Sequence, residues 1–217
     1  MHIELGIIAA TKLTLANIGA IATLSTNVIK FVKKPSLIIK TIFSAVFFTA
    51  FMQAFHMPVG ASELHFIGAS IVYLFFGFVP TLFGFALGLL LQALIFEPAD
   101  MLHIGVNILS LSIPLIAAHA LYGKKFFAKE NPSKVSWANI ARFDAIYYGG
   151  VIAMVAFWLS IGNEPMPLAN WAMFAIAYMP IVLIEPVITY GVLRLGQSHW
   201  GKKSLRKISV AGKLKFS

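Results

Sequence analysis

The sequence contains no cysteine, which excludes disulfide bonds, thiolate metal ligands and cysteine nucleophiles. Charged residues are also scarce, because they make up 12% of the 217 residues, whereas a typical soluble domain has about 25%. Hydrophobic residues account for 59% of the chain, and its mean hydropathy is +0.84. Such a chain cannot cover a surface that faces water. The composition therefore excludes a soluble protein and predicts an integral membrane protein.

Long apolar segments recur along the chain, most of them near the roughly 20 residues that an α-helix needs to cross a bilayer. The third segment is short, and a turn at Pro80 separates it from the fourth, so these two are expected to form a tight helical hairpin. Residues 56–66 (HMPVGASELHF) lack helical periodicity and are expected to form a loop. We predict one transmembrane domain over residues 1–217, an all-α membrane protein with a bundle of about seven transmembrane helices. The segments comprise residues 7–32, 37–55, 67–79, 81–96, 104–122, 140–161 and 171–195.

Basic residues are distributed unevenly among the predicted loops. Of the 17, all but Lys12 and Lys40 lie in the loops after the first and fifth segments, with their flanks, and in the C-terminal tail. Because Lys and Arg concentrate in cytoplasmic loops, we expect the N-terminus outside and the C-terminus cytoplasmic, in the plasma membrane. The net charge of +9 then needs no nucleic acid as a partner. The opposite, outer face would attract a cation, unless the asymmetry serves topology alone; its acidic residues are Glu4, Glu63, Glu97, Asp100 and Glu164.

Met1 and His2 form the most informative local feature. The start, MHIELG, lacks the basic region and cleavage site of a signal peptide, so Met1 is expected to keep a free amine. That amine, the deprotonated amide nitrogen of His2 and its imidazole Nδ1 can close two adjacent chelate rings on one metal ion. Planar nitrogen ligands suit Ni(II) or Cu(II), and Co(II) also fits. By itself, a histidine at position 2 is a chance occurrence in most proteins.

A fourth ligand is expected from residues 56–66, which contain His56 and His65. Proline and glycine in this stretch would let it fold back into the bundle, and His65 is the preferred ligand. His56 either supports the site or is a spectator. A loop histidine is more often solvated or hydrogen-bonded than metal-bound, but this loop and the N-terminus are predicted to share one face.

Two further polar residues lie at the expected outer end of the fifth segment, His103 and Asn107. Asn107 would hydrogen-bond a ligating imidazole and fix its tautomer, or it makes an ordinary contact between helices. His119 and His199 fall toward the cytoplasmic side and are expected to be unrelated to the site.

Four motifs, MHIELG, FHMPVGASELHFIG, LLLQALIF and HIGVN, resemble in order and spacing those of the CbiM/NikM family. This family comprises the substrate-binding components of cobalt and nickel transporters of the energy-coupling factor type. The resemblance covers about the first 120 residues by motif and the remainder mainly by hydropathy. It implies a seven-helix subunit whose N-terminus bends into the bundle, with Met1, His2 and His65 as the metal ligands.

The resemblance also implies the partners: a transmembrane coupling subunit and cytoplasmic ATPase subunits, which drive import of Ni(II) or Co(II) captured on the outer face. The chain has no phosphate-binding loop of the type G-x-x-x-x-G-K-[ST], so energy must come from a partner or a gradient. We expect no enzymatic activity and no cofactor beyond the transported metal ion. Ni(II) and Co(II) are not distinguished, since both accept nitrogen ligands.

Two alternatives belong to other functional classes. A membrane zinc enzyme would use His56, His65 and His103, although the chain has no H-E-x-x-H motif. An uptake component for an organic micronutrient would instead bind its substrate in an aromatic pocket.

Glu185 is the acidic residue deepest in a predicted helix, and an intramembrane carboxylate is a functional hypothesis by default. It would pair with Lys12 or Lys40, or else be protonated or paired within the bundle. Arg142 and Asp144, near the start of the sixth segment, are expected to meet the coupling subunit.

Overall fold

The structure is a computed structural model, and it describes residues 6–60, 62–163, 167–200 and 208–216. Within these residues, six helices are long and apolar enough to cross a membrane, and the chain is a multi-pass membrane protein. They are α1 (Ala10–Val32), α2 (Pro35–Ala54), α4 (Phe78–Ile95), α5 (Ile104–Leu121, preceded by the 3₁₀ helix η1, Pro98–His103), α6 (Trp137–Ser160) and α7 (Leu168–Leu195). The prediction of an all-helical membrane bundle is confirmed. Shorter elements are η2 (Gly123–Phe127), α8 (Gln197–Trp200) and η3 (Ala211–Lys213).

The third predicted segment forms a helix of only eight residues, α3 (Ala69–Phe76). Eight helical residues rise about 12 Å, which is too short to cross a hydrocarbon core of about 30 Å. The break before α4 lies at Gly77, whose φ of 86° favours glycine, and the predicted turn at Pro80 was wrong. Pro80 instead lies in the first turn of α4, where its missing N–H costs no hydrogen bond.

Residues 56–66 were predicted as a loop, but most of them form an antiparallel hairpin of β1 (His56–Val59) and β2 (Ser62–His65). Four-residue strands are too short to show clear alternation, and Pro58 and Gly60 are residues typical of loops. β1 is the outer strand and is largely exposed, whereas β2 is buried against α2 and α7. The expectation that this stretch folds back into the bundle is therefore confirmed.

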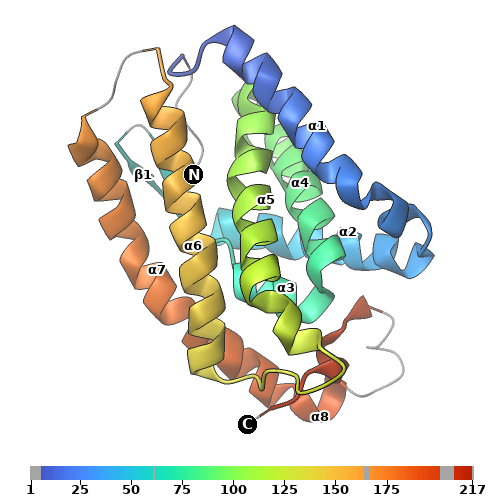
Figure 1. Cartoon of the computed structure of the whole chain (residues 1–217). Helices are drawn as coiled ribbons and strands as arrows, with labels where there is room; N and C mark the ends of the chain where they lie inside the picture. Colours follow the sequence, from blue (N-terminus) through green and yellow to red (C-terminus); the bar gives the residue numbers. More distant parts are fainter. Residues whose placement is uncertain (1–5, 61, 164–166, 201–207, 217) are drawn as a thin grey trace.

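The helices pack as a chain of neighbours, as Figure 1 shows: α2 lies on α4, α4 on α5, α5 on α6 and α6 on α7. α1 packs against α5 at the periphery, where the N–H of Gly105 donates to Asn17 Oδ1 at 3.0 Å. The outer side of α1 is apolar and exposed, as at Ile21, which is 70% exposed. This surface suits contact with lipid.

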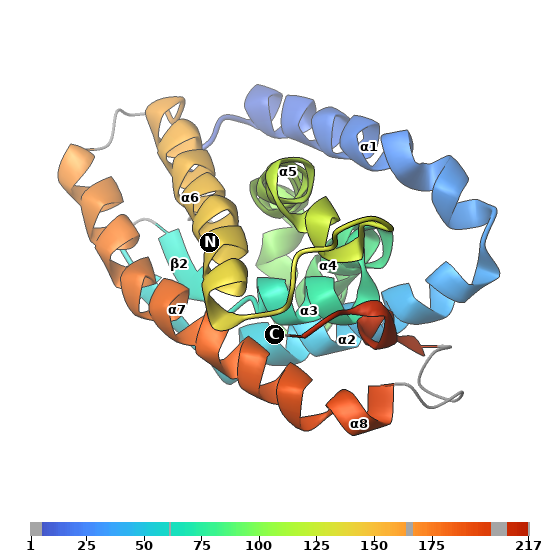
Figure 2. The same ribbon diagram turned by 60° about the horizontal axis from the view of Figure 1, so that its bottom comes forward.

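The bundle has two distinct ends. At one end, the start of α1 meets the link between α6 and α7, where the N–H of Asn163 donates to the carbonyl of Ile7 at 2.7 Å. At the other end (Figure 2), the C-terminal segment 208–216 lies near α3 and the loop between α5 and α6. A cavity at this second end is lined by Lys30, Lys33, Lys34 and Lys213. The structure thus brings basic residues from the first loop and the tail to one end, while the side of the membrane that it faces stays a prediction.

Candidate metal site

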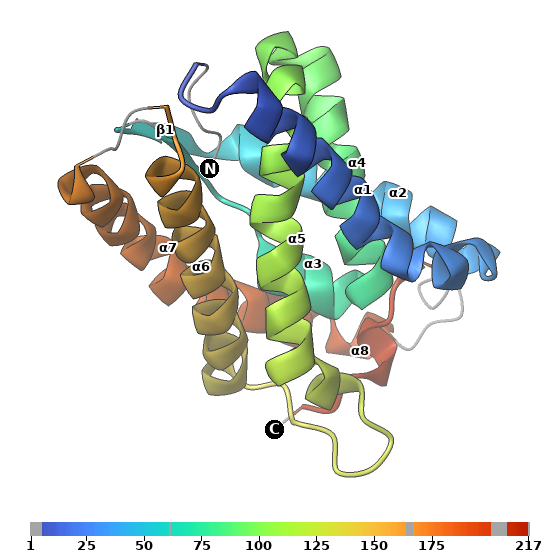
Figure 3. The same ribbon diagram turned by 45° about the horizontal axis from the view of Figure 1, so that its top comes forward.

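The hairpin carries His65 into the interior of the bundle, where the residue is 1% exposed. Its imidazole Nδ1 lies 3.4 Å from the carbonyl oxygen of Met52 in α2. Its own carbonyl accepts a hydrogen bond of 3.3 Å from the Tyr178 hydroxyl of α7. Figure 3 shows β1 beside the ends of α6 and α7, at the end of the bundle where α1 begins. His65 is thus held at a fixed place near this end.

The Glu63 carboxylate connects both histidines of the hairpin. Its Oε1 lies 2.8 Å from His56 Nδ1, and its Oε2 lies 3.1 Å from His65 Nε2. The two imidazole rings are stacked, with centroids 5.9 Å apart and an interplanar angle of 18°. The register explains this cluster, because His56 is directly opposite His65, and Glu63 lies two residues before His65 on the same face of the strand.

The role of Glu63 was missed from the sequence, which placed it only among the acidic residues of the outer face. The signal was its spacing of two residues from His65, which puts both side chains on one face only if the stretch is a strand. In a loop, which is what the sequence predicts for residues 56–66, a spacing of two residues does not place side chains on one face.

Met1 and His2, the other expected ligands, lie outside the described residues. Among the residues that the structure does describe, no group of three His, Asp or Glu side chains is arranged to hold a metal ion. The set His56, His65 and His103 that a zinc enzyme would need is therefore not assembled as a metal site. His103 is buried, 2% exposed, and it directly precedes α5.

Asn107 lies one turn into α5 and is 1% exposed. Neither atom of its amide group has a hydrogen-bond partner within the described part of the chain. Leaving such groups unpaired costs about 1–3 kcal/mol, so the side chain is unusual for an ordinary contact between helices. Its predicted bond to a ligating imidazole remains a prediction.

The remaining histidines lie away from the hairpin. His119 Nδ1 is 2.7 Å from the Tyr73 hydroxyl, and its ring stacks on Phe78 with centroids 4.0 Å apart. It lines the cavity that contains the lysines at the opposite end of the bundle. His199 lies in α8, beyond the end of α7.

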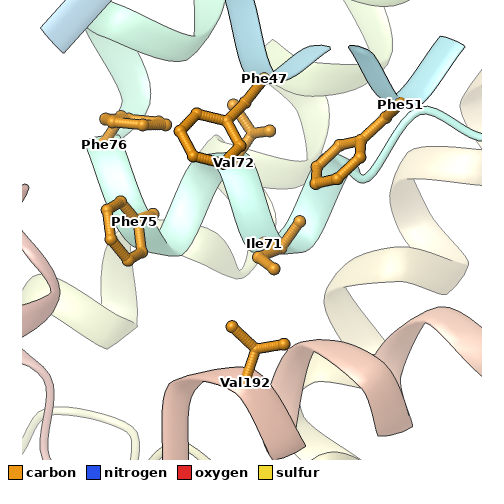
Figure 4. A pocket seen from close by; sticks show the side chains of 7 residues that line it. All are labelled: Phe47, Phe51, Ile71, Val72, Phe75, Phe76 and Val192. Atoms are coloured by element: carbon orange, nitrogen blue, oxygen red, sulfur yellow. The ribbon is translucent and has the colours of Figure 1, made fainter. Parts of the chain in front are cut away.

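An apolar pocket lies between α2, α3 and α7 (Figure 4). Its volume is about 180 Å³, whereas small-molecule sites measure about 300–1,000 Å³. Its walls contain no polar side chain that would orient a vitamin-like substrate, so this pocket gives the micronutrient alternative no support. It is lined by Phe47, Phe51, Ile71, Val72, Phe75, Phe76 and Val192.

Glu185 lies in a fully buried polar cluster where α3, α6 and α7 meet. Of the two alternatives, pairing with Lys12 or Lys40 is wrong and pairing within the bundle is confirmed: Ser70 and Tyr148 bind the carboxylate, and Lys12 Nζ donates to the carbonyl of Ile161 at 2.5 Å. Asp144 belongs to the same cluster and is 0% exposed, so its expected place on a surface for the coupling subunit is also wrong.

Comparisons with known proteins identify the family and the fold of the chain. The model of the CbiM family, described as "Cobalt uptake substrate-specific transmembrane region", matches residues 2–199. A "Putative metal transport protein" of Haemophilus influenzae is 24% identical over 195 residues, which cover 90% of this chain and 92% of that protein. A crystal structure of a transition metal transporter superposes with a TM-score of 0.76 at 19% identity, covering 95% of this chain and 97% of the other. The last likeness establishes the fold.

Proposed function

Since this chain belongs to the CbiM family of cobalt uptake substrate-specific transmembrane regions, we propose that it is the substrate-binding component of an energy-coupling factor type ABC transporter. It captures Ni(II) or Co(II) at the outer face of the plasma membrane for import driven by ATP. The observation that carries this proposal is the buried imidazole of His65, whose Nδ1 lies 3.4 Å from the Met52 carbonyl oxygen and whose Nε2 lies 3.1 Å from Glu63 Oε2.

The proposed ligands are the Met1 amine, the amide nitrogen and imidazole of His2, and the imidazole of His65. A metal-binding histidine usually donates its other ring N–H to a carboxylate, which fixes the ring and strengthens the ligand. Glu63 Oε2 lies 3.1 Å from His65 Nε2 and suits this role. Nδ1, which lies 3.4 Å from the Met52 carbonyl oxygen, would then bind the metal.

His56 and Asn107 support the ligands in this proposal. His56 fixes the second oxygen of Glu63, and the buried amide of Asn107 is available to bond a ligating imidazole. Nothing in this donor set separates Ni(II) from Co(II), because both accept nitrogen ligands.

The proposed partners are a transmembrane coupling subunit and cytoplasmic ATPase subunits, because the sequence has no phosphate-binding loop of its own. The exposed Arg142 remains a candidate contact for the coupling subunit at the end of the bundle with the lysines. The purified chain alone should bind metal without hydrolysing ATP.

Titration calorimetry with Ni(II) and Co(II) tests the ligand set. We expect no binding by His2→Ala or by a chain with one extra residue before Met1, because both destroy the chelate. His65→Ala should lose at least 10-fold in affinity, since it removes one ligand of four. His199→Ala is the matched control and should bind like the wild type. Full affinity in the extended chain would rule out the terminal chelate, and full affinity in His65→Ala would rule out the hairpin as its partner.

A further inference from the structure

Two carboxylates meet inside the bundle. Asp144 of α6 and Glu185 of α7 are both 0% exposed. The Ser70 hydroxyl of α3 lies 3.0 Å from Asp144 Oδ2 and 3.0 Å from Glu185 Oε1. Within the described residues, no Lys, Arg or His side chain forms an ion pair with either carboxylate.

Glu185 has the environment of an ionised carboxylate. Its Oε1 accepts the backbone N–H of Ser70 at 2.9 Å, and its Oε2 accepts the Tyr148 hydroxyl. Gly68 and Ser70 are at the start of α3, whose first N–H groups have no partner within the helix. Glu185 therefore caps α3 in place of a local side chain, where the helix dipole also favours a negative charge.

Asp144 has a different environment. Its Oδ2 contacts the Ser70 hydroxyl, but its Oδ1 has no hydrogen-bond partner in the described structure. The hydroxyl of Tyr147, one turn along α6, also has none, although it lies within the electrostatic influence of both carboxylates. An ionised carboxylate with a single shared donor in this interior would be strongly unfavourable.

Counting hydrogens around Ser70 decides the protonation of the pair. A hydroxyl has one hydrogen and two lone pairs, and Ser70 Oγ has three oxygen neighbours, since Thr189 Oγ1 is 2.9 Å away. Thr189 can donate to Ser70, and Ser70 can donate to one carboxylate only. The other carboxylate oxygen must itself donate, so it must carry a proton.

We propose that Asp144 and Glu185 form a proton-binding site inside the membrane bundle, with the proton on Asp144 Oδ2 and the negative charge on Glu185. Every polar contact of Ser70 is then satisfied: Thr189 and Asp144 donate to its oxygen, and Ser70 donates to Glu185. The site holds one proton and one negative charge. Its ligand is a proton, and the proposal does not depend on which metal the hairpin binds.

The titratable groups around this proton come from all the packed helices. α6 contributes Tyr147 and Tyr148, α7 contributes Tyr178 and Glu185, and α3 contributes only the neutral Ser70. Loss of the proton would place two negative charges on either side of Ser70 and break the bridge that joins the three helices. Ser70 follows His65 by five residues, and Tyr178 of α7 bonds the His65 carbonyl, so α3 and α7 both connect the proton site to the hairpin.

Infrared spectroscopy of the purified full-length protein at neutral pH tests the proposal. A protonated carboxyl group has a carbonyl band that is distinct from those of carboxylates and amides and that shifts in D₂O. The chain contains only two aspartates, Asp100 and Asp144. Labelling the side-chain carboxyl carbon of aspartate with ¹³C in the wild type should therefore shift this band. No substitution that could disturb folding is needed.

Asp144→Asn should abolish the band, and its matched control Asp100→Asn should retain it. Asparagine can still donate to Ser70, so this variant should keep its fold. The proposal is overturned if the wild type lacks a protonated-carboxyl band, if the band does not respond to labelled aspartate, or if Asp100→Asn removes it. A cation held between the two carboxylates would give the first of these results.

Discussion

At the scale of single residues, Glu63 is the side chain that contacts both histidines of the hairpin. Each of its oxygens faces a different imidazole, at 2.8 Å and 3.1 Å, and the carboxylate is only partly exposed. Carboxylates in this position orient a ligating ring and raise its basicity. Glu63 would thus support the proposed site by holding the His65 ring in place.

Glu63→Gln should weaken Ni(II) binding by about 10–100-fold, the usual effect of losing such a partner. The amide keeps the shape of the side chain but loses the charge that lies 3.1 Å from His65 Nε2. Glu130→Gln, an exposed change in the loop between α5 and α6, is the control for net charge. Equal affinities of the two variants in calorimetry would contradict an orienting role for Glu63.

At the scale of elements, α3 depends on residues outside its own eight-residue sequence. Its N-cap, Gly68, has a φ of 65°, in the left-handed region, and no side chain of its own to cap the helix. A Cβ built at Gly68 would lie 2.4 Å from Phe51 Cδ2. The helix begins where it does because glycine alone allows this turn and because Glu185 supplies the missing cap.

Gly68→Ala should therefore destabilise the protein by about 1–3 kcal/mol, the cost of holding a non-glycine residue in a strained backbone conformation, and the Phe51 contact adds to this. Gly149→Ala is the control, since nothing lies within 4 Å of its Cβ position in α6. Thermal unfolding in detergent compares the two. A wild-type unfolding temperature for Gly68→Ala would mean that the start of α3 can rearrange without cost.

The sequence predicted the long helices well and the region 56–80 poorly, for a physical reason. Each long helix must contribute about 20 apolar residues to match the bilayer, and such runs are visible in composition alone. The hairpin depends on strand register, because Glu63 pairs with His56 only in the correct register. The start of α3 depends on a partner distant in sequence, because Ser70 meets Glu185 across 115 positions. Segment length and hydropathy do not predict these contacts.

At the scale of the whole molecule, the bundle has one end with the hairpin and one end with the lysine-lined cavity. If positive residues face the cytoplasm, the hairpin end is outside. The polar cluster of Asp144 and Glu185 lies between them, within α6 and α7.

Cysteine labelling in intact cells tests this orientation, and the chain has no native cysteine to interfere. A membrane-impermeant maleimide should label Met57→Cys, at an exposed position of β1, and should not label Ser133→Cys in the loop between α5 and α6. Both should react after the membrane is dissolved in detergent. The reverse pattern in intact cells would invert the proposed topology.

The shortness of α3 has a consequence for biogenesis. α2 and α4 are long enough to be sorted into the bilayer one at a time, but eight helical residues give an insertion machinery too little apolar length to recognise as a span. α2 ends and α4 begins at opposite ends of the bundle, so the stretch between them has to be threaded across. We infer that this step waits for α6 and α7, since Asp144 and Glu185 bind Ser70 only after those helices have been synthesised. The hairpin that precedes α3 is therefore among the last parts of the protein to reach its place.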